Sequence, residues 1–181
     1  MSSNIQSEAR YVIVNKKSGT VIDLSGTDNY QVIGWERHNG TNQQWETIEV
    51  GGGWHIKNVG NGKYLSLGGA SAQDGVSVVG TDDHFLWELK TDDKDPNGVR
   101  IKVPHSYQNV DLSDHGNPTP GTHVVVWGRW EGTNQVWYFE QGIKPPLNYE
   151  ASVLTSLCVQ FDFEGPIVSK ENPMFPMKLE R

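Results

Sequence analysis

Short runs of alternating apolar and polar residues recur along the chain, whereas the 3.6-residue periodicity of amphipathic helices is nearly absent. Three blocks have the apolar–polar–apolar pattern that a half-buried strand requires, at residues 22–24, 65–67 and 110–112. A tryptophan follows the middle residue of each block after 22, 21 and 26 residues, respectively: Trp45, Trp87 and Trp137. Because self-similar spacing of this kind indicates an internal repeat, the chain is predicted to contain three repeats.

Each repeat has three further apolar runs, which we interpret as strands. One run precedes each block, at residues 11–14, 54–57 and 99–103. Another lies between the block and the tryptophan, at residues 32–35, 76–79 and 124–127. The last begins at the tryptophan itself, at residues 45–48, 87–89 and 137–139. Turn-forming pairs such as Asn61-Gly62 separate the runs, and the pattern therefore predicts twelve strands in an all-β protein.

The number of repeats selects the architecture. The tryptophans are 42 and 50 residues apart, a period that would also suit a blade of a β-propeller. Three blades are too few to close a ring, because propellers have about four to eight. Three four-stranded repeats can instead close a threefold barrel with a hairpin cap. We therefore predict a β-trefoil domain at residues 1–141, with repeats at about 9–50, 51–92 and 97–141.

Residues 142–181 are the part of the chain that the repeats leave unexplained. Pro145-Pro146 ends the predicted barrel, and a partly alternating apolar run at 153–163 suggests one or two strands. A segment of 40 residues is too small to hold its own core. We expect this C-terminal extension to pack on the trefoil, to join a homodimer or to be partly disordered. Its Cys158 is the only cysteine and lacks a recognisable histidine partner, so a nucleophilic role is not expected.

Composition and charge argue against several classes of partner. The formal net charge is −7, which opposes binding to nucleic acid or to anionic lipid surfaces. No apolar run approaches the ~20 residues of a membrane span, and residues 1–10 lack the pattern of a secretory signal. A single cysteine fits a reducing compartment, so we expect a cytoplasmic protein, with non-classical release left open. The six histidines are scattered, and neither a metal nor another cofactor is expected.

Two segments carry the same motif, in which Asn and Gln precede the tryptophan of the repeat. They are Asn42-Gln43-Gln44-Trp45 and Asn134-Gln135-Val136-Trp137. With the Asp-Leu-Ser blocks at 23–25 and 111–113, they make residues 9–141 similar to the ricin-B-type β-trefoil lectins, and especially to the short lectins of fungi. The resemblance implies a protein that binds glycans, usually through galactose or N-acetylgalactosamine, and that defends against glycan-bearing organisms.

The resemblance also implies a role for each site residue. In that family an aspartate accepts hydrogen bonds from sugar hydroxyls, an aromatic ring stacks on the sugar, and the motif asparagine completes the clamp. Carboxylates and carboxamides suit hydroxyls because they offer paired acceptors and donors, and a flat ring covers the apolar C–H face. The motif glutamine and tryptophan are mainly structural. The first-repeat site is therefore assigned to Asp23 and Asn42, with Trp35 or His38 as the stacking residue.

The third repeat keeps the same residue types behind a longer loop. Its candidates are Asp111 and Asn134, with Trp127 and Trp130 at the positions that Trp35 and His38 have in the first repeat. The interval from the aspartate to the first of these tryptophans is 16 residues here against 12 in the first repeat, because of the turn-rich segment 114–120. This loop could shape a second site or lie across it. The first repeat is therefore predicted to be the main site.

The second repeat has lost the pattern and is predicted to be structural. Ser66 stands in place of the aspartate, His84 in place of the asparagine and Phe85 in place of the glutamine. His115 and His123 flank the loop of the third repeat, and we expect them to be simply exposed. The acidic residues at 82–83 and 92–95 fall in polar turns, where we expect them to be solvated.

An enzymatic function is not expected. Glycosidases need two carboxylates at a defined separation, and Asp23 and Asp111 belong to different repeats of a threefold fold. The alternative to a lectin is a β-trefoil protease inhibitor that acts through exposed loops, such as Pro118-Thr119-Pro120.

Overall fold

The structure is a computed structural model that describes residues 5–142. The strands predicted at 153–163 and Cys158 lie outside the described residues. The predicted domain boundaries, the predicted packing of the extension and the predicted homodimer stay predictions. Within residues 5–142, no helix is both long and apolar enough to cross a membrane.

Six strands close a barrel, and they are the first and last strands of the three repeats. They are β1 (Ala9–Asn15), β4 (Trp45–Val50), β5 (Gly53–Asn58), β8 (Glu88–Thr91), β9 (Val99–Lys102) and β12 (Trp137–Gln141). Antiparallel pairing joins β8, β9, β12, β1, β4 and β5 in that order. A bridge between Trp54 and Trp87 joins β5 to the start of β8. The ring is therefore closed, and its inner face is available for a core.

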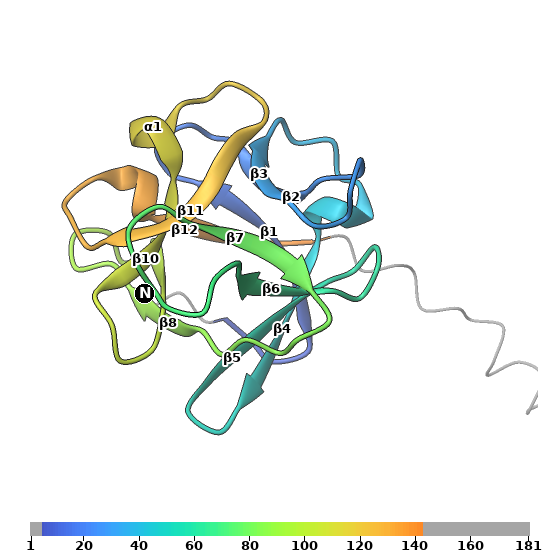
Figure 1. Ribbon diagram of the computed structural model, residues 1–181, viewed down its shortest axis with the longest axis horizontal. Coiled ribbons are helices and arrows are strands. Elements are labelled where there is room, and N and C mark those ends of the chain that lie inside the picture. Colours follow the sequence, from blue (N-terminus) through green and yellow to red (C-terminus); the bar gives the residue numbers. More distant parts are fainter. Residues whose placement is uncertain (1–4, 143–181) are drawn as a thin grey trace, which may run out of the picture. The chain divides into compact units, whose positions relative to one another are not determined.

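The other six strands form three hairpins, one in each repeat (Figure 1). The hairpins are β2 (Val21–Leu24) with β3 (Val32–Trp35), β6 (Tyr64–Leu67) with β7 (Val76–Thr81), and β10 (Gln108–Leu112) with β11 (Thr122–Gly128). The hairpins also pair with one another, since His123 of β11 lies opposite Ile33 of β3 and Val125 lies opposite Ser77 of β7. Each of these contacts joins residues of two different repeats.

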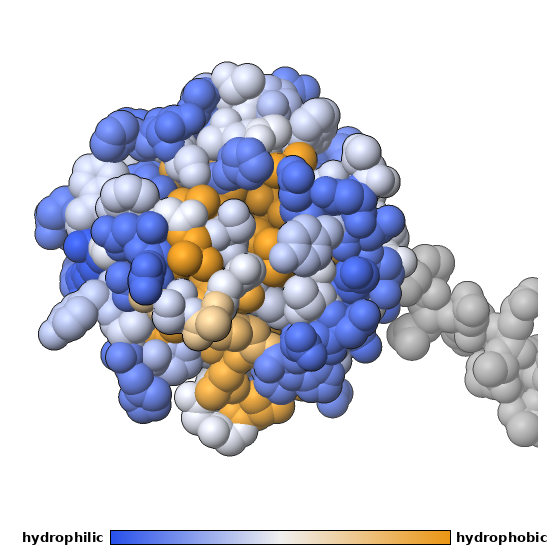
Figure 2. Space-filling model, viewed as in Figure 1, coloured by the Kyte–Doolittle hydropathy of each residue, from blue (hydrophilic) through white to orange (hydrophobic). Residues whose placement is uncertain are grey.

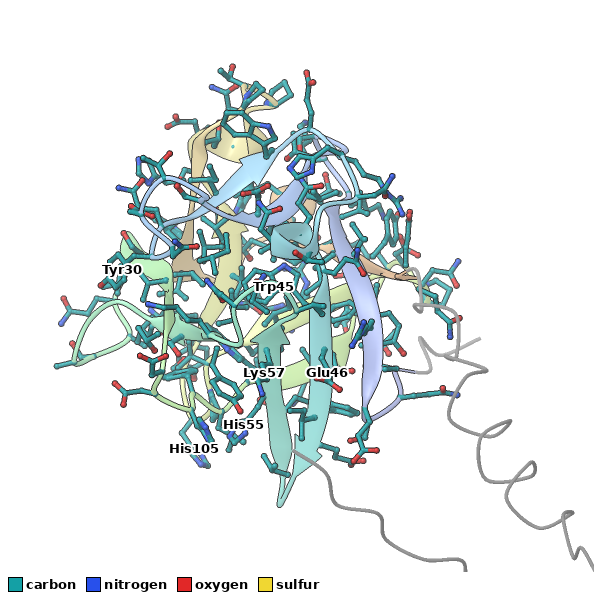
Figure 3. The ribbon with its side chains drawn as sticks, turned by 90° about the vertical axis from the view of Figure 1, so that its right-hand side faces the viewer. Tyr30, Trp45, Glu46, His55, Lys57 and His105 are labelled. Carbon is teal, nitrogen blue, oxygen red and sulfur yellow. The ribbon has the colours of Figure 1, made fainter. Side chains whose placement is uncertain are left out.

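The three repeat tryptophans hold the hairpins to the barrel by the same hydrogen bond. Trp45, Trp87 and Trp137 are all 0% exposed, and Figure 3 shows Trp45 in the interior. Each indole Nε1–H donates to a backbone carbonyl of a hairpin strand, and the acceptors are Ile22 at 3.0 Å, Leu65 at 2.7 Å and Val110 at 3.0 Å. Because a buried N–H needs a partner, these bonds fix the strand that carries Asp23, Ser66 or Asp111.

The predicted fold class is confirmed: the chain is an all-β protein, and its strands form a β-trefoil. All twelve predicted strands are present, each within two residues of its predicted ends. On the face drawn in Figure 2, hydrophobic residues show mainly in a central strip that hydrophilic residues surround. Three short helical turns were not predicted, because a single turn is too short to produce helical periodicity. They are η1 (Thr41–Gln43), α1 (Ser113–Gly116) and η2 (Thr133–Gln135).

Candidate functional site

In the first repeat, polar side chains meet around the carboxylate of Asp23, which lies on β2 and is 4% exposed. The η1 turn places Asn42 and Gln43 against it. Asn42 Nδ2 lies 3.0 Å from both carboxylate oxygens, and Gln43 Nε2 donates to Oδ2 at 2.8 Å. Burial raises the pKa of Asp23, and the hydrogen bond from Gln43 partly offsets this rise. The motif glutamine therefore orients the carboxylate in addition to its structural role.

Of the two aromatic candidates of the first repeat, His38 is the one that contacts this clamp. His38 Nε2 lies 3.4 Å from Asp23 Oδ2, and the backbone N–H of His38 donates to Gln43 Oε1 at 2.8 Å. Trp35 is 39% exposed on β3, and its ring lies next to Gly121 of the third repeat. The first repeat therefore has one exposed aromatic ring, that of His38, against its carboxylate.

The third repeat builds the same clamp in a more open form. Asp111 lies on β10 and is 5% exposed. Its Oδ2 accepts hydrogen bonds from Gln135 Nε2 at 2.9 Å and from Trp130 Nε1 at 3.4 Å. Asn134 Nδ2 donates to the carbonyl of Leu112 at 3.1 Å, as Asn42 Nδ2 does to the carbonyl of Leu24 at 3.2 Å in the first repeat. Within the described part of the chain, the hydrogen bonds from Gln135 and Trp130 both reach Oδ2 of Asp111.

Burial also raises the pKa of Asp111, and the hydrogen bonds from Gln135 and Trp130 oppose the rise. The backbone N–H of Trp130 donates to Gln135 Oε1 at 3.2 Å, just as His38 donates to Gln43. The structure therefore places His38 and Trp130 at equivalent positions, in agreement with the count from the sequence.

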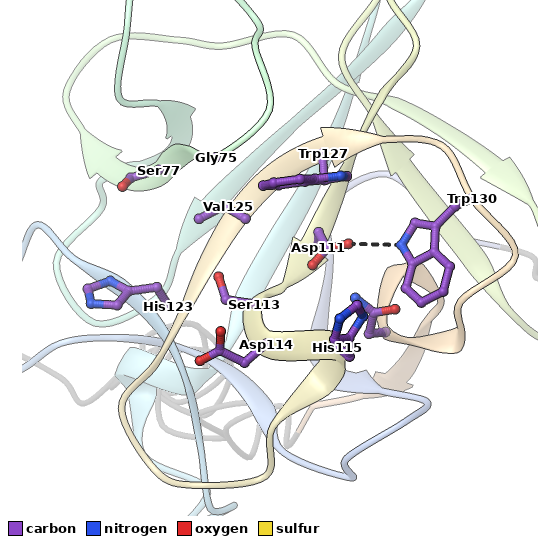
Figure 4. A pocket seen from close by; sticks show the side chains of 11 residues that line it. Gly75, Ser77, Asp111, Ser113, Asp114, His115, His123, Val125, Trp127 and Trp130 are labelled. Atoms are coloured by element: carbon purple, nitrogen blue, oxygen red, sulfur yellow. Dashed lines mark hydrogen bonds between the residues drawn. The ribbon is translucent and has the colours of Figure 1, made fainter.

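A cavity of about 710 Å³ opens at the third-repeat clamp (Figure 4). All four third-repeat candidates line it, and two of them are exposed indoles, Trp127 at 46% and Trp130 at 42%. Two residues of the second repeat, Gly75 and Ser77, also line it. No sequence motif indicates these two residues, because they reach the cavity through the pairing of β7 with β11 across repeats.

The sequence left open whether the turn-rich loop of the third repeat shapes a site or lies across it. In the structure, Asp114 and His115 of this loop line the cavity, so the loop shapes it. Asp114 and His115 have left-handed backbone angles (φ 53° and 55°), and Gly116 follows at φ 80°. A Cβ on Gly116 would lie 2.9 Å from Cβ of Asn134, so only glycine lets the loop approach the clamp this closely. The ring of His115 meets Trp130 edge-on at 5.6 Å between centroids.

The two histidines of this region are exposed, as expected, but they also form part of the cavity wall. His115 and His123 both line the cavity. Sequence reasoning missed this because neither residue belongs to the motif.

A buried ion pair, Arg100 with Asp92, contacts Gln135 of the third-repeat clamp. Arg100 Nε donates to Asp92 Oδ2 at 2.6 Å, and Arg100 Nη1 donates to Gln135 Oε1 at 3.1 Å. Burial is the largest influence and would raise the pKa of Asp92, but the hydrogen bonds from Arg100 and from the backbone N–H of Lys94, together with the positive charge of Arg100, outweigh it and the pKa is lowered. The expectation that Asp92 is solvated is wrong, since it is 7% exposed. Its partner lies on β9, and a turn-rich sequence does not reveal such a contact.

In the second repeat, rings occupy the place of the clamp. Ser66 Oγ donates to the carbonyl of Asp83 at 2.9 Å, and the ring of His84 lies 4.1 Å from that of Tyr64. Among the residues that the structure describes, no group of three His, Cys, Asp or Glu side chains is placed to hold a metal ion.

A closed barrel, three hairpins and a carboxylate–carboxamide clamp on two of them define a β-trefoil of the lectin class. The family profile described as ricin-type beta-trefoil lectin domain-like matches residues 3–81 and 41–127. The chain belongs to this family. A search of curated proteins gives no match.

Three solved structures illustrate the likeness. The ricin B-like lectin of Macrolepiota procera, in complex with lactose, is 42% identical over 76% of this chain and 99% of its own, with a TM-score of 0.74. The Rhizoctonia solani agglutinin is 26% identical over 76% and 97%, with a TM-score of 0.68. The designed threefold-symmetric protein ThreeFoil is 25% identical over 73% and 98%, with a TM-score of 0.67.

Proposed function

We propose that this protein is a non-enzymatic lectin for glycans that contain galactose or N-acetylgalactosamine. The clamps of the first and third repeats are the binding sites. The observation that carries the proposal is the carboxylate of Asp111, whose Oδ2 is held by Gln135 and Trp130 and which lines a cavity together with two exposed indoles.

This arrangement suits a pyranose. Sugar hydroxyls donate to the carboxylate in hydrogen bonds to a charged acceptor, which contribute about 1.5–3 kcal/mol each. The C–H face of the ring can lie on Trp127 or Trp130 in the third repeat, and on Trp35 or His38 in the first. The proposed galactose-type sugar is supported by the Macrolepiota procera lectin, whose structure holds lactose, a galactoside.

A defensive role against organisms that display such glycans is part of the proposal, and the family resemblance supports it. A feeding or toxicity assay with a binding-deficient variant as control tests this part.

A glycan array with the full chain tests the proposed binding. The wild type is expected to bind galactosides, and the double variant Asp23→Ala/Asp111→Ala is expected to bind none. Ser66→Ala, at the corresponding position of the second repeat, is the matched control and should leave the array unchanged. A folded wild type that binds no glycan on a broad array would refute the proposal. A protease panel run beside the array tests the inhibitor alternative.

A further inference from the structure

The cavity of the third repeat extends well beyond its clamp. Trp130, His115 and Asn134 surround Asp111 on one side, and we call this the clamp subsite. Val125, Ser77, Gly75 and His123 line the other side, which we call the side subsite, and Trp127, Ser113 and Asp114 complete the lining. Figure 4 shows Asp111 between Trp130 and the side subsite, with Trp127 beside both.

Two repeats build the side subsite together. Val125 of β11 lies opposite Ser77 of β7 in an antiparallel pair. The backbone N–H of Gly75 donates to the carbonyl of Val126 at 2.9 Å. A Cβ on Gly75 would lie 3.7 Å from the ring of Trp127, so the glycine backbone lies close to the indole. The second repeat, which has lost its own clamp, therefore supplies a wall of its neighbour's site.

The size and lining of the cavity fit a ligand larger than one sugar ring. Pockets of about 300–1,000 Å³ hold drug-sized ligands, and a volume of about 710 Å³ lies within this range. The eleven lining residues include two carboxylates, Asp111 and Asp114, and neither lysine nor arginine. This charge disfavours sialylated or sulfated sugars. Ser77 and His123 offer partners for hydroxyls, and Val125 offers an apolar contact.

The corresponding position in the first repeat is filled differently. Ser77 lies opposite Val125, whereas His123 lies opposite Ile33 at the equivalent step of the first repeat. An imidazole therefore stands beside the first-repeat strand where the third-repeat site has only a hydroxymethyl group. This contrast makes the two clamps suited to ligands of different length.

We infer that the third-repeat site takes a neutral oligosaccharide of at least two sugars. A terminal galactose-type residue occupies the clamp subsite, and the adjoining sugar occupies the side subsite between Trp127, Val125 and Ser77. The inference rests on the proposed function, which supplies the first sugar.

The test isolates the third-repeat site in the full-length Asp23→Ala variant. Isothermal titration compares methyl β-galactoside, methyl N-acetylgalactosaminide and a panel of neutral galactose-terminated disaccharides that differ in linkage. At least one disaccharide should bind fivefold or more tightly than either monosaccharide. Ser77→Leu, which fills the side subsite, should bring that ratio close to one and leave methyl β-galactoside binding unchanged. Ser77→Thr should give an intermediate ratio, and it serves if the leucine variant unfolds.

The matched control is the Asp111→Ala background, in which only the first repeat can bind. There Ser77→Leu should change no affinity. Equal affinity for all monosaccharides and disaccharides in the Asp23→Ala background would overturn the inference, and so would a gain obtained in full by methyl N-acetylgalactosaminide. Loss of all binding in that background, with the wild type still active, would also overturn it but leave the proposed function standing. A folded wild type that binds none of these sugars would refute the proposed function itself.

Discussion

The first and third repeats have the same residue types around a buried aspartate, but they differ in how that carboxylate is hydrogen-bonded. In the first repeat, Asn42 Nδ2 is within hydrogen-bonding distance of both carboxylate oxygens of Asp23, so each oxygen has a partner within the protein. In the third, the hydrogen bonds from Gln135 and Trp130 both reach Oδ2 of Asp111, and the asparagine bond to a backbone carbonyl is one that both repeats share. The motif alone does not distinguish these states. The prediction that the first repeat is the main site stays a prediction, and the geometry gives the third repeat an equal claim.

The largest expected effect tests the support behind the third-repeat clamp. Arg100→Met leaves Asp92 buried without its partner, and breaking a buried pair in this way costs about 3–5 kcal/mol of unfolding free energy. Chemical denaturation measures this loss. Galactoside binding should weaken at the third repeat only, because Gln135 loses the donor Nη1 of Arg100.

The double variant Arg100→Met/Asp92→Leu should recover most of the stability, since apolar side chains can replace a buried ion pair with little loss. Lys90→Met removes the exposed pair with Glu88 and should cost no more than about 1 kcal/mol. Equal losses for Arg100→Met and Lys90→Met would contradict the role assigned to the buried pair.

The next effect is a pH dependence shared by both clamps. Sugar hydroxyls need ionised acceptors, and burial raises the pKa of Asp23 and Asp111 above the ordinary value of about 3.9. Affinity should therefore begin to fall at a pH above 3.9, and approach a loss of about tenfold per pH unit well below the raised pKa. Titrations with a galactoside between neutral and acid pH measure it.

In this titration, the protein should stay folded at acid pH values at which galactoside binding is already weakened. Asp95 accepts from Lys16 and Tyr138, and the bond from Lys16 lowers the pKa of Asp95 to about 2. A lowered pKa stabilises the folded state above the ordinary range of aspartate, and this contribution is lost only as the pH falls towards about 2. Binding and circular dichroism signals that disappear together would contradict the assignment of the pH dependence to the clamps.

Exchanging the equivalent aromatic residues is expected to move affinity from one site to the other. His38→Trp gives the first repeat an indole beside Asp23, and added stacking should tighten binding there by about 0.5–1.5 kcal/mol. Trp130→His should weaken the third repeat by a similar amount. Each exchange is measured in the background that inactivates the other clamp. If neither exchange changes affinity, Trp35 and Trp127 are the stacking residues instead.

The smallest effect concerns the left-handed loop. His115 has φ 55°, which costs a non-glycine residue about 1–2 kcal/mol. Glycine relieves this strain but loses about 0.5–1 kcal/mol of conformational entropy. His115→Gly should therefore stabilise the fold by about 0.5–1 kcal/mol while weakening third-repeat binding, because the imidazole beside Trp130 is lost. Thermal unfolding with His123→Ala as control separates the two changes, and a destabilised glycine variant would contradict the strain.

The sequence predicted what depends on local alternation and left hidden what depends on pairing between repeats. Each strand leaves its own apolar–polar signature, and the motif places Asp23, Asn42, Asp111 and Asn134 at their clamps. The side subsite has no such signature, because Ser77 reaches Val125 through strands some fifty residues apart in the chain. The burial of Asp92 could not be predicted for the same reason. Its turn sequence shows that the residue is polar, but not that Arg100 on the next strand pairs with it in a buried position.

The sharing of one cavity between two hairpins has a consequence for how such a protein can be rebuilt. The second repeat lacks the clamp residues, yet its Gly75 and Ser77 line the cavity of the third repeat. A substitution in the second repeat can therefore change the cavity of the third. Duplicating or transplanting a single repeat would carry its clamp along and leave the matching wall behind.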